Sequence, residues 1–335
     1  MNNLLAIFMC LIFAIVSQLL SKHIGGSYML YALFIGIVLS SILYNEKTKQ
    51  GVDYTGKKIL RIGVALLGVR ITFNEMSVLG VDVLFALILS IFATISFGVI
   101  VARLMGLDSR TGTISGGAVA ICGASAAIAI SSIFPHSKKI EQQTLFVIVA
   151  VNILSTIAML LYPLIIKYME YNSLQAGVFL GGAIHDVAQV VGASLSISEE
   201  VGDIATITKL FRVAMLLPVV FLLSIIITLM VKNKSQDSEI HAQAPFPMFL
   251  IVFILLVGFN SFDLLLFELP IINWQLNSTL AFISKILLTM SVFALGLKTS
   301  FKDVMNIGSK YILLVILETI FITILVLLIT TYIVV

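Results

Sequence analysis

The amino-acid sequence predicts an all-α polytopic membrane protein, on the evidence of its composition and its long apolar runs. Hydrophobic residues make up 60% of the chain and charged residues only 11%, whereas a soluble domain is roughly 25% charged. Mean hydropathy is +1.14. The apolar runs are roughly 17 to 25 residues long, enough to cross a bilayer. We therefore expect one transmembrane domain over residues 1–335, with about ten or eleven spans.

Each apolar run predicts one span in chain order. The first is taken as a retained helix, because it lacks the basic leader and small-residue cleavage site of a secretory signal. The main hydrophilic stretch, residues 232–247, is the predicted loop between two helix groups. Spans are expected near residues 4–20, 28–44, 57–72, 82–105, 111–134, 141–168, 174–196, 201–231, 246–266, 276–298 and 310–333.

Lysine and arginine in the loops predict the orientation. With the N-terminus in the cytoplasm, most of the basic loop residues lie inside, which is the usual bias. Lys138 and Lys139 are the exception, because a simple alternation of spans puts them outside.

Two segments resemble each other internally. Residues 65–80 align without gaps to residues 293–308, and Arg70 matches Lys298 in charge. Under the charge-derived orientation the two segments run in opposite directions, which is an inverted-topology repeat. Chance similarity between apolar segments is the alternative. The identical pairs are Leu67/Leu295, Gly68/Gly296, Phe73/Phe301 and Gly80/Gly308.

The fifth span is rich in glycine, alanine and serine. Glycine weakens a helix, and non-helical backbone at membrane depth survives only in protein or around a water-filled cavity. We expect a half-helix that starts within residues 113–117 and presents its N–H groups to an anion. Close helix packing is the alternative use of such small residues. The candidate substrate-binding residues here are Thr113, Ser115, Gly116, Gly117 and Gly123.

The seventh span contains a histidine and an aspartate. On one helix Gly182, His185, Gln189 and Gly192 would share a stripe, with Asp186 at its border. Histidine titrates near neutrality, so His185 and Asp186 are the candidate coupling-ion residues, and Gly182 and Gln189 candidate substrate-binding residues. Alternatively, Asp186 caps backbone groups that the glycines leave unpaired.

The orientation of these two spans is a problem for the sequence alone. The fifth and seventh spans would run parallel, whereas the mates of an inverted repeat run antiparallel. Either one of them is re-entrant, or a span between them has been missed, or they are not repeat mates.

Four further charges lie in predicted spans. Lys209 and Arg212 share one helix face and are candidate anion ligands, since arginine offers a bidentate fork. The alternatives are that they snorkel to an interface or neutralise a buried acid. Lys285 and Glu318 are expected to form a structural ion pair.

Several segments resemble the bacterial putative sulfate exporter family. They are GGAVAICGASAAIA (116–129), GVFLGGAIHDVAQVVGA (177–193), TKLFRVAMLLP (208–218) and RIGVALLGVRITF (61–73). The family is grouped with cation:proton antiporters and anion transporters, and FALGLKTSFKDV (293–304) is also similar to a bile-acid symporter helix. The resemblance implies inverted repeats, discontinuous crossing helices, and core and panel bundles in the bacterial inner (plasma) membrane.

Together these observations predict a secondary active transporter of a small anion. Sulfate, sulfite or an organic sulfonate is the expected substrate, with H⁺ or Na⁺ as coupling ion and the lipid bilayer as surroundings. An intramembrane enzyme using Cys122, Ser125, His185 and Asp186, a lipid-binding structural protein and an uncoupled channel are the alternatives. No catalytic residue, metal, cofactor or nucleic-acid partner is predicted, and a homodimer remains open.

Overall fold

A computed structural model confirms the all-α membrane fold. It describes residues 2–25, 27–77, 79–135, 137–231, 248–262, 268–269, 274–298 and 309–334, so the predicted loop at 232–247 lies outside the described residues. Six of the described helices are long and apolar enough to cross a membrane. The only described strands are β1 (Glu268–Leu269) and β2 (Trp274–Gln275), which pair antiparallel.

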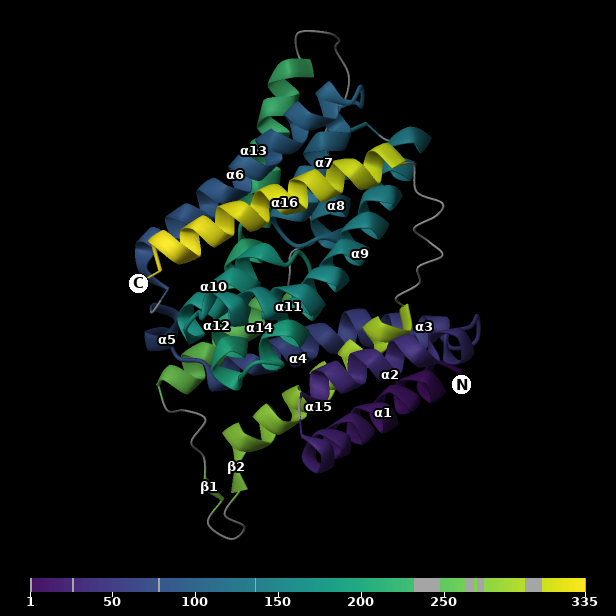
Figure 1. The fold of residues 1–335 in the computed structure, drawn as a ribbon, viewed down its shortest axis with the longest axis vertical. Helices are drawn as coiled ribbons and strands as arrows, with labels where there is room; N and C mark the ends of the chain where they lie inside the picture. Colours follow the sequence, from purple (N-terminus) through teal and green to yellow (C-terminus); the bar gives the residue numbers. More distant parts are fainter. Residues whose placement is uncertain are drawn as a thin grey trace.

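The helices form two bodies, which we call the panel and the core after the predicted bundles (Figure 1). In the panel, the third span is irregular: a π-helical turn, η1, and a 3₁₀ turn, η2, interrupt it. The panel contains α1 (Asn2–Ile24), α2 (Tyr28–Leu43), α3 (Lys49–Tyr54), η1 (Thr55–Ile59), α4 (Leu60–Leu66), η2 (Leu67–Arg70), α14 (Met248–Ser261) and α15 (Leu276–Lys298).

The core carries two helices that are broken in the middle. Short α5 (Phe73–Ser77) leads into it from the panel. The core contains α6 (Gly80–Leu104), α7 (Ser109–Ala120), α8 (Ala124–Ser131), α9 (Lys138–Met169), α10 (Ser173–Ala183), α11 (Val187–Leu195), α12 (Glu199–Ala214), α13 (Leu216–Val231) and α16 (Ser309–Tyr332).

Small residues bring the helices close together. In the panel, a Cβ on Gly36 of α2 would lie 3.0 Å from Gly296 Cα of α15. In the core, a Cβ on Gly116 of α7 would lie 2.9 Å from Ile95 Cα of α6. Approach this close requires glycine, so the packing role considered for the small residues of the fifth span is present.

The fifth predicted span is a re-entrant hairpin of α7 and α8, here called the first hairpin. A straight helix would separate Gly117 from Ile130 by about 20 Å. Instead the Ile130 side chain fills the space where a Cβ on Gly117 would be. Gly123 lies beside Val151, halfway along α9, so α8 returns toward the end of the core where α9 begins.

The seventh predicted span is a second re-entrant hairpin, made of α10 and α11. The rings of Phe179 in α10 and Tyr162 near the end of α9 lie 5.3 Å apart, as expected for a chain that turns back after α9. Along α11 the contacts then follow α9 in the same direction: Asp186 with Ser155, Gln189 with Thr156, and Gly192 with Met159. Thus α11 leads back to the end from which α10 entered.

The two hairpins enter from opposite ends of the core, and α16 marks those ends. Lys310 at its start donates to Met105 O at 3.2 Å, close to where α7 begins. At its other end Gln175, in the first turn of α10, donates to Val334 O at 3.2 Å. We call these the Lys310 end and the Arg70 end. Both predicted parallel spans therefore double back, which answers the question of their orientation.

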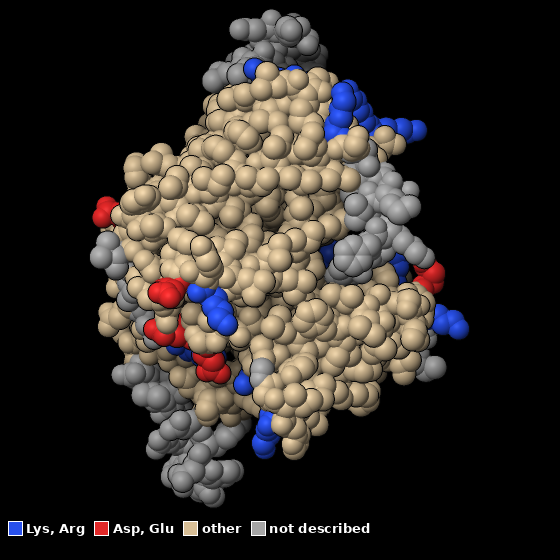
Figure 2. Space-filling model, in the orientation of Figure 1, with Lys and Arg blue, Asp and Glu red and all other residues tan. Residues whose placement is uncertain are grey.

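The re-entrant first hairpin also changes the end of the core at which two basic residues are expected. Because the first hairpin is re-entrant, Lys138 and Lys139 lie at the Lys310 end, which in Figure 1 is the right-hand side and also holds the N-terminus and α3. The simple alternation of spans was wrong for this pair. Figure 2 shows few charged side chains on this face, and most of them gather toward its two sides.

Candidate functional site

The tips of the two hairpins meet inside the core. Each tip is a three-residue break, 121–123 in the first hairpin and 184–186 in the second. Ile121 and Ile184 are the C-caps of α7 and α10, whereas Gly123 and Asp186 are the N-caps of α8 and α11. The expected half-helix start within 113–117 is therefore corrected to Gly123. The stripe expected on one helix is likewise not formed, because α10 ends before His185.

Lys209 and Arg212 of α12 join the two tips. Lys209 Nζ donates to Ile121 O at 2.7 Å and to Ile184 O at 2.8 Å, one carbonyl from each C-cap. Arg212 donates to carbonyls in the last turns of both helices and to the Ile184 C-cap, and both side chains are 0% exposed. The acceptors of Arg212 are Val119 (3.1 Å), Ala120, Gly181 (3.1 Å), Gly182 and Ile184 (3.5 Å).

These contacts have a clear physical basis. The last four carbonyls of a helix have no partner within the helix, and its C-terminus carries partial negative charge. At membrane depth such groups need a partner in the protein. The two cations supply donors and opposite charge to both helix ends at once. As direct anion ligands Lys209 and Arg212 stay a prediction, and neither lines the pocket described below.

The N-terminal sides of the two tips differ from each other. Asp186 caps α11 with its own carboxylate, whose Oδ1 accepts from Ala188 N at 2.8 Å. Gly123 has a φ of +67° and no side chain with which to cap α8. The two caps are neighbours: a Cβ on Gly123 would lie 3.9 Å from Asp186 Cβ. One helix start thus has a built-in anion, and the adjacent one does not.

A pocket of about 260 Å³ lies at this point, between the core and the panel. Its core wall includes both tips and the start of α8, and its panel wall carries two cations that the sequence analysis did not include, Lys57 and Arg61. The sequence signal for them was their charge within the predicted span at 57–72. The π-helical turn that carries Lys57, a feature frequent at functional sites, is seen only in the structure. The lining residues are Gly56, Lys57, Leu60, Arg61, Val64, Cys122, Ala124, Ser125, Ile128, Asp186, Val187, Val213, Leu216 and Phe249.

His185 lies on the other side of the second tip, away from the pocket lining, and is 0% exposed. Its Nδ1 is 3.2 Å from Val119 O, and its Nε2 is 3.0 Å from Thr319 Oγ1. The same hydroxyl lies 2.7 Å from Val315 O. A neutral ring donates to Val119 and accepts from Thr319. A charged ring donates to both, and the Thr319 hydroxyl then turns to Val315.

The other predicted substrate-binding residues of the first hairpin lie within α7, before the tip. Thr113 donates to Ser109 O at 3.0 Å, and Ser115 to Glu318 Oε1 at 2.7 Å. Gly116 packs on α6 and Gly117 on Ile130. Of the five candidates here, the structure brings only Gly123 to the pocket region.

In the second hairpin, Gly182 packs against Val326 of α16. Gln189 is 0% exposed and its Nε2 lies 3.5 Å from Thr156 Oγ1. Asp186 is the one predicted residue of this hairpin that lines the pocket.

One expectation about an ion pair and one about catalysis change. Lys285 and Glu318 do not pair: Lys285 lies over the Tyr28 ring in the panel, whereas Glu318 is bonded to Ser115 in the core. The enzyme alternative also loses support. Cys122 and Ser125 line the pocket, but in the described part of the chain His185 directs its ring to Val119 and Thr319 rather than to either nucleophile.

Comparison with known proteins shows one family over nearly the whole chain. The family model described as Conserved hypothetical protein 698 matches residues 4–315 and 264–334. The UPF0324 membrane protein CT0845 of Chlorobaculum tepidum is 40% identical over 94% of this chain and 85% of its own length. The UPF0324 membrane protein TauZ of Paracoccus denitrificans is 38% identical over 93% and 90% respectively.

A third relative, the UPF0324 membrane protein RB0971 of Rhizobium meliloti, is 39% identical over 94% of this chain and 88% of its own length. All three are described as membrane proteins, in agreement with the fold. The chain therefore belongs to the UPF0324 membrane protein family.

Proposed function

We propose that the protein is a secondary transporter of a small oxyanion, with sulfate, sulfite and organic sulfonates as candidate substrates. One observation carries the proposal. The start of α8 has no side-chain cap and lines a pocket that also holds the cations Lys57 and Arg61. Helix N-termini bind anions through their backbone N–H groups and their dipole.

The oxyanion binds against the N–H groups at the start of α8, near Ala124 and Ser125. Lys57 and Arg61 approach from the panel wall of the same pocket. Arginine holds an oxyanion through two parallel hydrogen bonds, and lysine adds a compact charge. The anion thus contacts both bodies, so a motion of one against the other changes its surroundings.

Asp186 couples this anion to a cation. Its carboxylate lines the same pocket and caps the helix start next to Gly123. Two negative charges in one low-dielectric site repel each other strongly, so the anion binds better once Asp186 takes up a proton or pairs with Na⁺. Uptake of the two ligands is therefore linked.

His185 gives the site a second proton position. Both of its ring nitrogens keep a hydrogen-bond partner whether the ring is neutral or charged, because the Thr319 hydroxyl can turn between Nε2 and Val315 O. Histidine is the side chain best suited to exchange protons near neutral pH.

Access to the pocket alternates through motion of the core against the panel. We propose that α6 and α16, which run antiparallel with Phe97 and Phe321 stacked at 4.1 Å, belong to two inverted repeats together with the two hairpins. Of the second predicted repeat segment, 293–308, residues 299–308 lie outside the described residues. The basic Lys310 end faces the cytoplasm of a bacterial inner membrane.

The proposal is tested with the purified full chain. We expect sulfate, sulfite or an alkyl sulfonate to raise the melting temperature, because a ligand that binds the folded state stabilises it by mass action. In proteoliposomes the same anion should accumulate when a pH or Na⁺ gradient is imposed. No thermal shift with any of these anions would contradict the oxyanion site. Flux indifferent to both gradients would favour a channel.

A further inference from the structure

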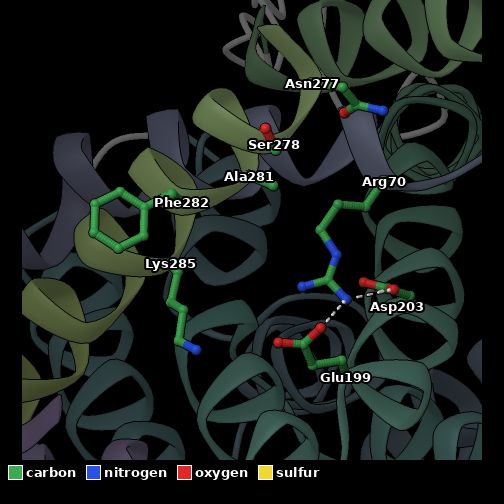
Figure 3. A pocket seen from close by; sticks show the side chains of 8 residues that line it. All are labelled: Arg70, Glu199, Asp203, Asn277, Ser278, Ala281, Phe282 and Lys285. Carbon is green, nitrogen blue, oxygen red and sulfur yellow. Dashed lines mark hydrogen bonds and ion pairs between the residues drawn. The ribbon is translucent and has the colours of Figure 1, made fainter. Parts of the chain in front are cut away.

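A second pocket lies between the two bodies at the opposite end from Lys310. It has a volume of about 440 Å³, and its walls come from η2 and α15 of the panel and from α12 of the core (Figure 3). Figure 3 shows Arg70 and Lys285 reaching into the same space from different elements. The lining residues are Arg70, Glu199, Asp203, Asn277, Ser278, Ala281, Phe282 and Lys285.

Arg70 holds the two bodies together at this pocket. Its Nη2 lies 3.1 Å from Glu199 Oε2 and 3.1 Å from Asp203 Oδ2, so one panel cation binds two core carboxylates. Both carboxylates are in the first two turns of α12, the helix whose Lys209 and Arg212 hold the hairpin tips. A contact that fixes the start of α12 to the panel therefore restrains the whole core.

Lys285 adds a second positive charge to the panel wall. Its ammonium lies 4.6 Å from the Tyr28 ring centroid, and no carboxylate among the described residues forms an ion pair with it. The two basic side chains come from the panel and the two acidic side chains from the core. Separation of the bodies would therefore leave a purely cationic wall on the panel side.

We propose that this pocket is a second oxyanion site, at which the anion competes with Glu199 and Asp203 for Arg70 and so releases the core from the panel. The inference rests on the proposed function, because it places the same anion in a second pocket, at the Arg70 end of the core–panel interface. Arg70 offers the fork that binds a carboxylate or an oxyanion equally well, and Lys285 favours the incoming anion.

The positions of the two pockets relative to the ends of the core agree with a second oxyanion site at the Arg70 end. The pocket at the hairpin tips, here called the central pocket, follows α8 from Ala124 at the tip to Ile128, in the direction of the Lys310 end. At the Arg70 end the ion pairs join the bodies. The side chains of both ion pairs are partly exposed, 20% for Arg70 and 63% and 22% for Glu199 and Asp203, so an anion from solution can reach Arg70 and exchange with the carboxylates.

The test measures access to the pocket with a cysteine placed at Ala281. The Ala281→Cys chain in detergent is labelled with a membrane-impermeant maleimide, in sodium chloride or in sodium sulfate of equal ionic strength. The parent chain gives the background, because Cys10 and Cys122 are 0% and 5% exposed. We expect sulfate to raise the labelling rate several-fold.

Variants in the same background assign the effect. With Arg70→Gln, labelling should be fast in chloride and unchanged by sulfate. If that variant does not fold, Glu199→Gln should raise the chloride rate instead. With Lys285→Gln the response should need more sulfate. With Lys58→Gln, a change at a residue that lines neither pocket, the sulfate dependence should be kept.

Two results would overturn the inference. If sulfate raises the melting temperature but leaves the labelling rate unchanged, the second site is refuted and the central oxyanion site stands. If the sulfate response disappears with Lys57→Gln but not with Lys285→Gln, the release begins at the central pocket. The absence of any thermal shift with sulfate, sulfite and sulfonate would refute the proposed function itself.

Discussion

Gly123 and Asp186 cap two adjacent helix starts, and a Cβ on Gly123 would lie only 3.9 Å from Asp186 Cβ. One cap brings a carboxylate to its helix, and the other leaves its helix start without a side-chain cap. On the proposed function, this juxtaposition places the oxyanion beside the carboxylate that takes up the coupling cation.

The backbone of the first tip requires glycine. We expect Gly123→Ala to lower the free energy of unfolding by about 1–3 kcal/mol, because a φ of +67° strains any residue with a Cβ. Thermal unfolding in detergent measures this. Gly258→Ala is the matched control, since its Cβ would meet nothing nearer than 3.8 Å at an ordinary helical position. Equal melting temperatures for the two variants would contradict the assigned tip geometry.

Replacement of Asp186 should separate coupling from folding. Asparagine is as good an N-cap as aspartate, so Asp186→Asn should fold and bind the anion. Its binding and exchange should lose their dependence on Na⁺ and the part of their pH dependence that comes from residue 186, because that residue is then always neutral. Exchange and gradient-driven accumulation in proteoliposomes are the two readouts. If the variant accumulates the anion at the rate of the parent chain, Asp186 does not take part in the coupling step.

Two neighbouring lysines provide a paired test of the anion site. Lys57 lines the central pocket, whereas Lys58 lies 5.4 Å from the Tyr54 ring centroid and is not among the lining residues. We expect Lys57→Gln to weaken oxyanion binding about tenfold, equivalent to about 1.4 kcal/mol, and Lys58→Gln to leave it unchanged. Calorimetric titration with sulfate measures both. Equal losses would point to a general effect of net charge.

Arg212 should be essential for the stability of the core. Its removal leaves buried carbonyls of α7 and α10 without donors, and hydrogen bonds to charged groups contribute about 1.5–3 kcal/mol each. Arg212→Gln should therefore lower the free energy of unfolding by roughly 3 kcal/mol or more. Lys310→Gln removes a single exposed bond to Met105 O and should have little effect. A stable Arg212→Gln protein would show that the carbonyls have other partners.

The hydroxyl of Thr319 should tune the pH dependence of transport. Thr319→Val removes the group that accepts from charged His185 and donates to neutral His185. The loss is larger for the charged ring, since hydrogen bonds to charged groups are the stronger ones. The half-maximal point of the pH–rate profile should therefore move to more acidic pH. An unshifted profile would mean that His185 does not exchange protons during transport.

Much of the fold follows from local sequence. Apolar length and the scarcity of charge predicted the membrane helices, and glycine content marked both broken segments. The exact break points were harder to place. The break in the first hairpin depends on the backbone conformation of Gly123, and several neighbouring glycines made other positions equally plausible. In the second hairpin, Asp186 was weighed as a cap, and that role is the one observed.

Other features depend on contacts between segments far apart in the chain. Re-entry of a hairpin is set by where its tip finds partners, and those partners are Lys209 and Arg212 of α12. Their charge suggested an anion site, although their environment is two helix C-termini. Lys57 and Arg61 reach the central pocket only because the panel packs against the hairpin tips, a relation that no local pattern encodes.

The hydrogen bonds from Lys209 and Arg212 of α12 to both hairpin tips also limit how the protein can move. Neither tip can shift alone without breaking hydrogen bonds in the dry interior, whereas both can travel together at no such cost. On the proposed function, the bound anion therefore moves with both hairpin tips as one rigid unit, and the panel stays fixed. Substitutions where the core faces the panel away from the pocket should therefore change the transport rate more than the affinity for the anion.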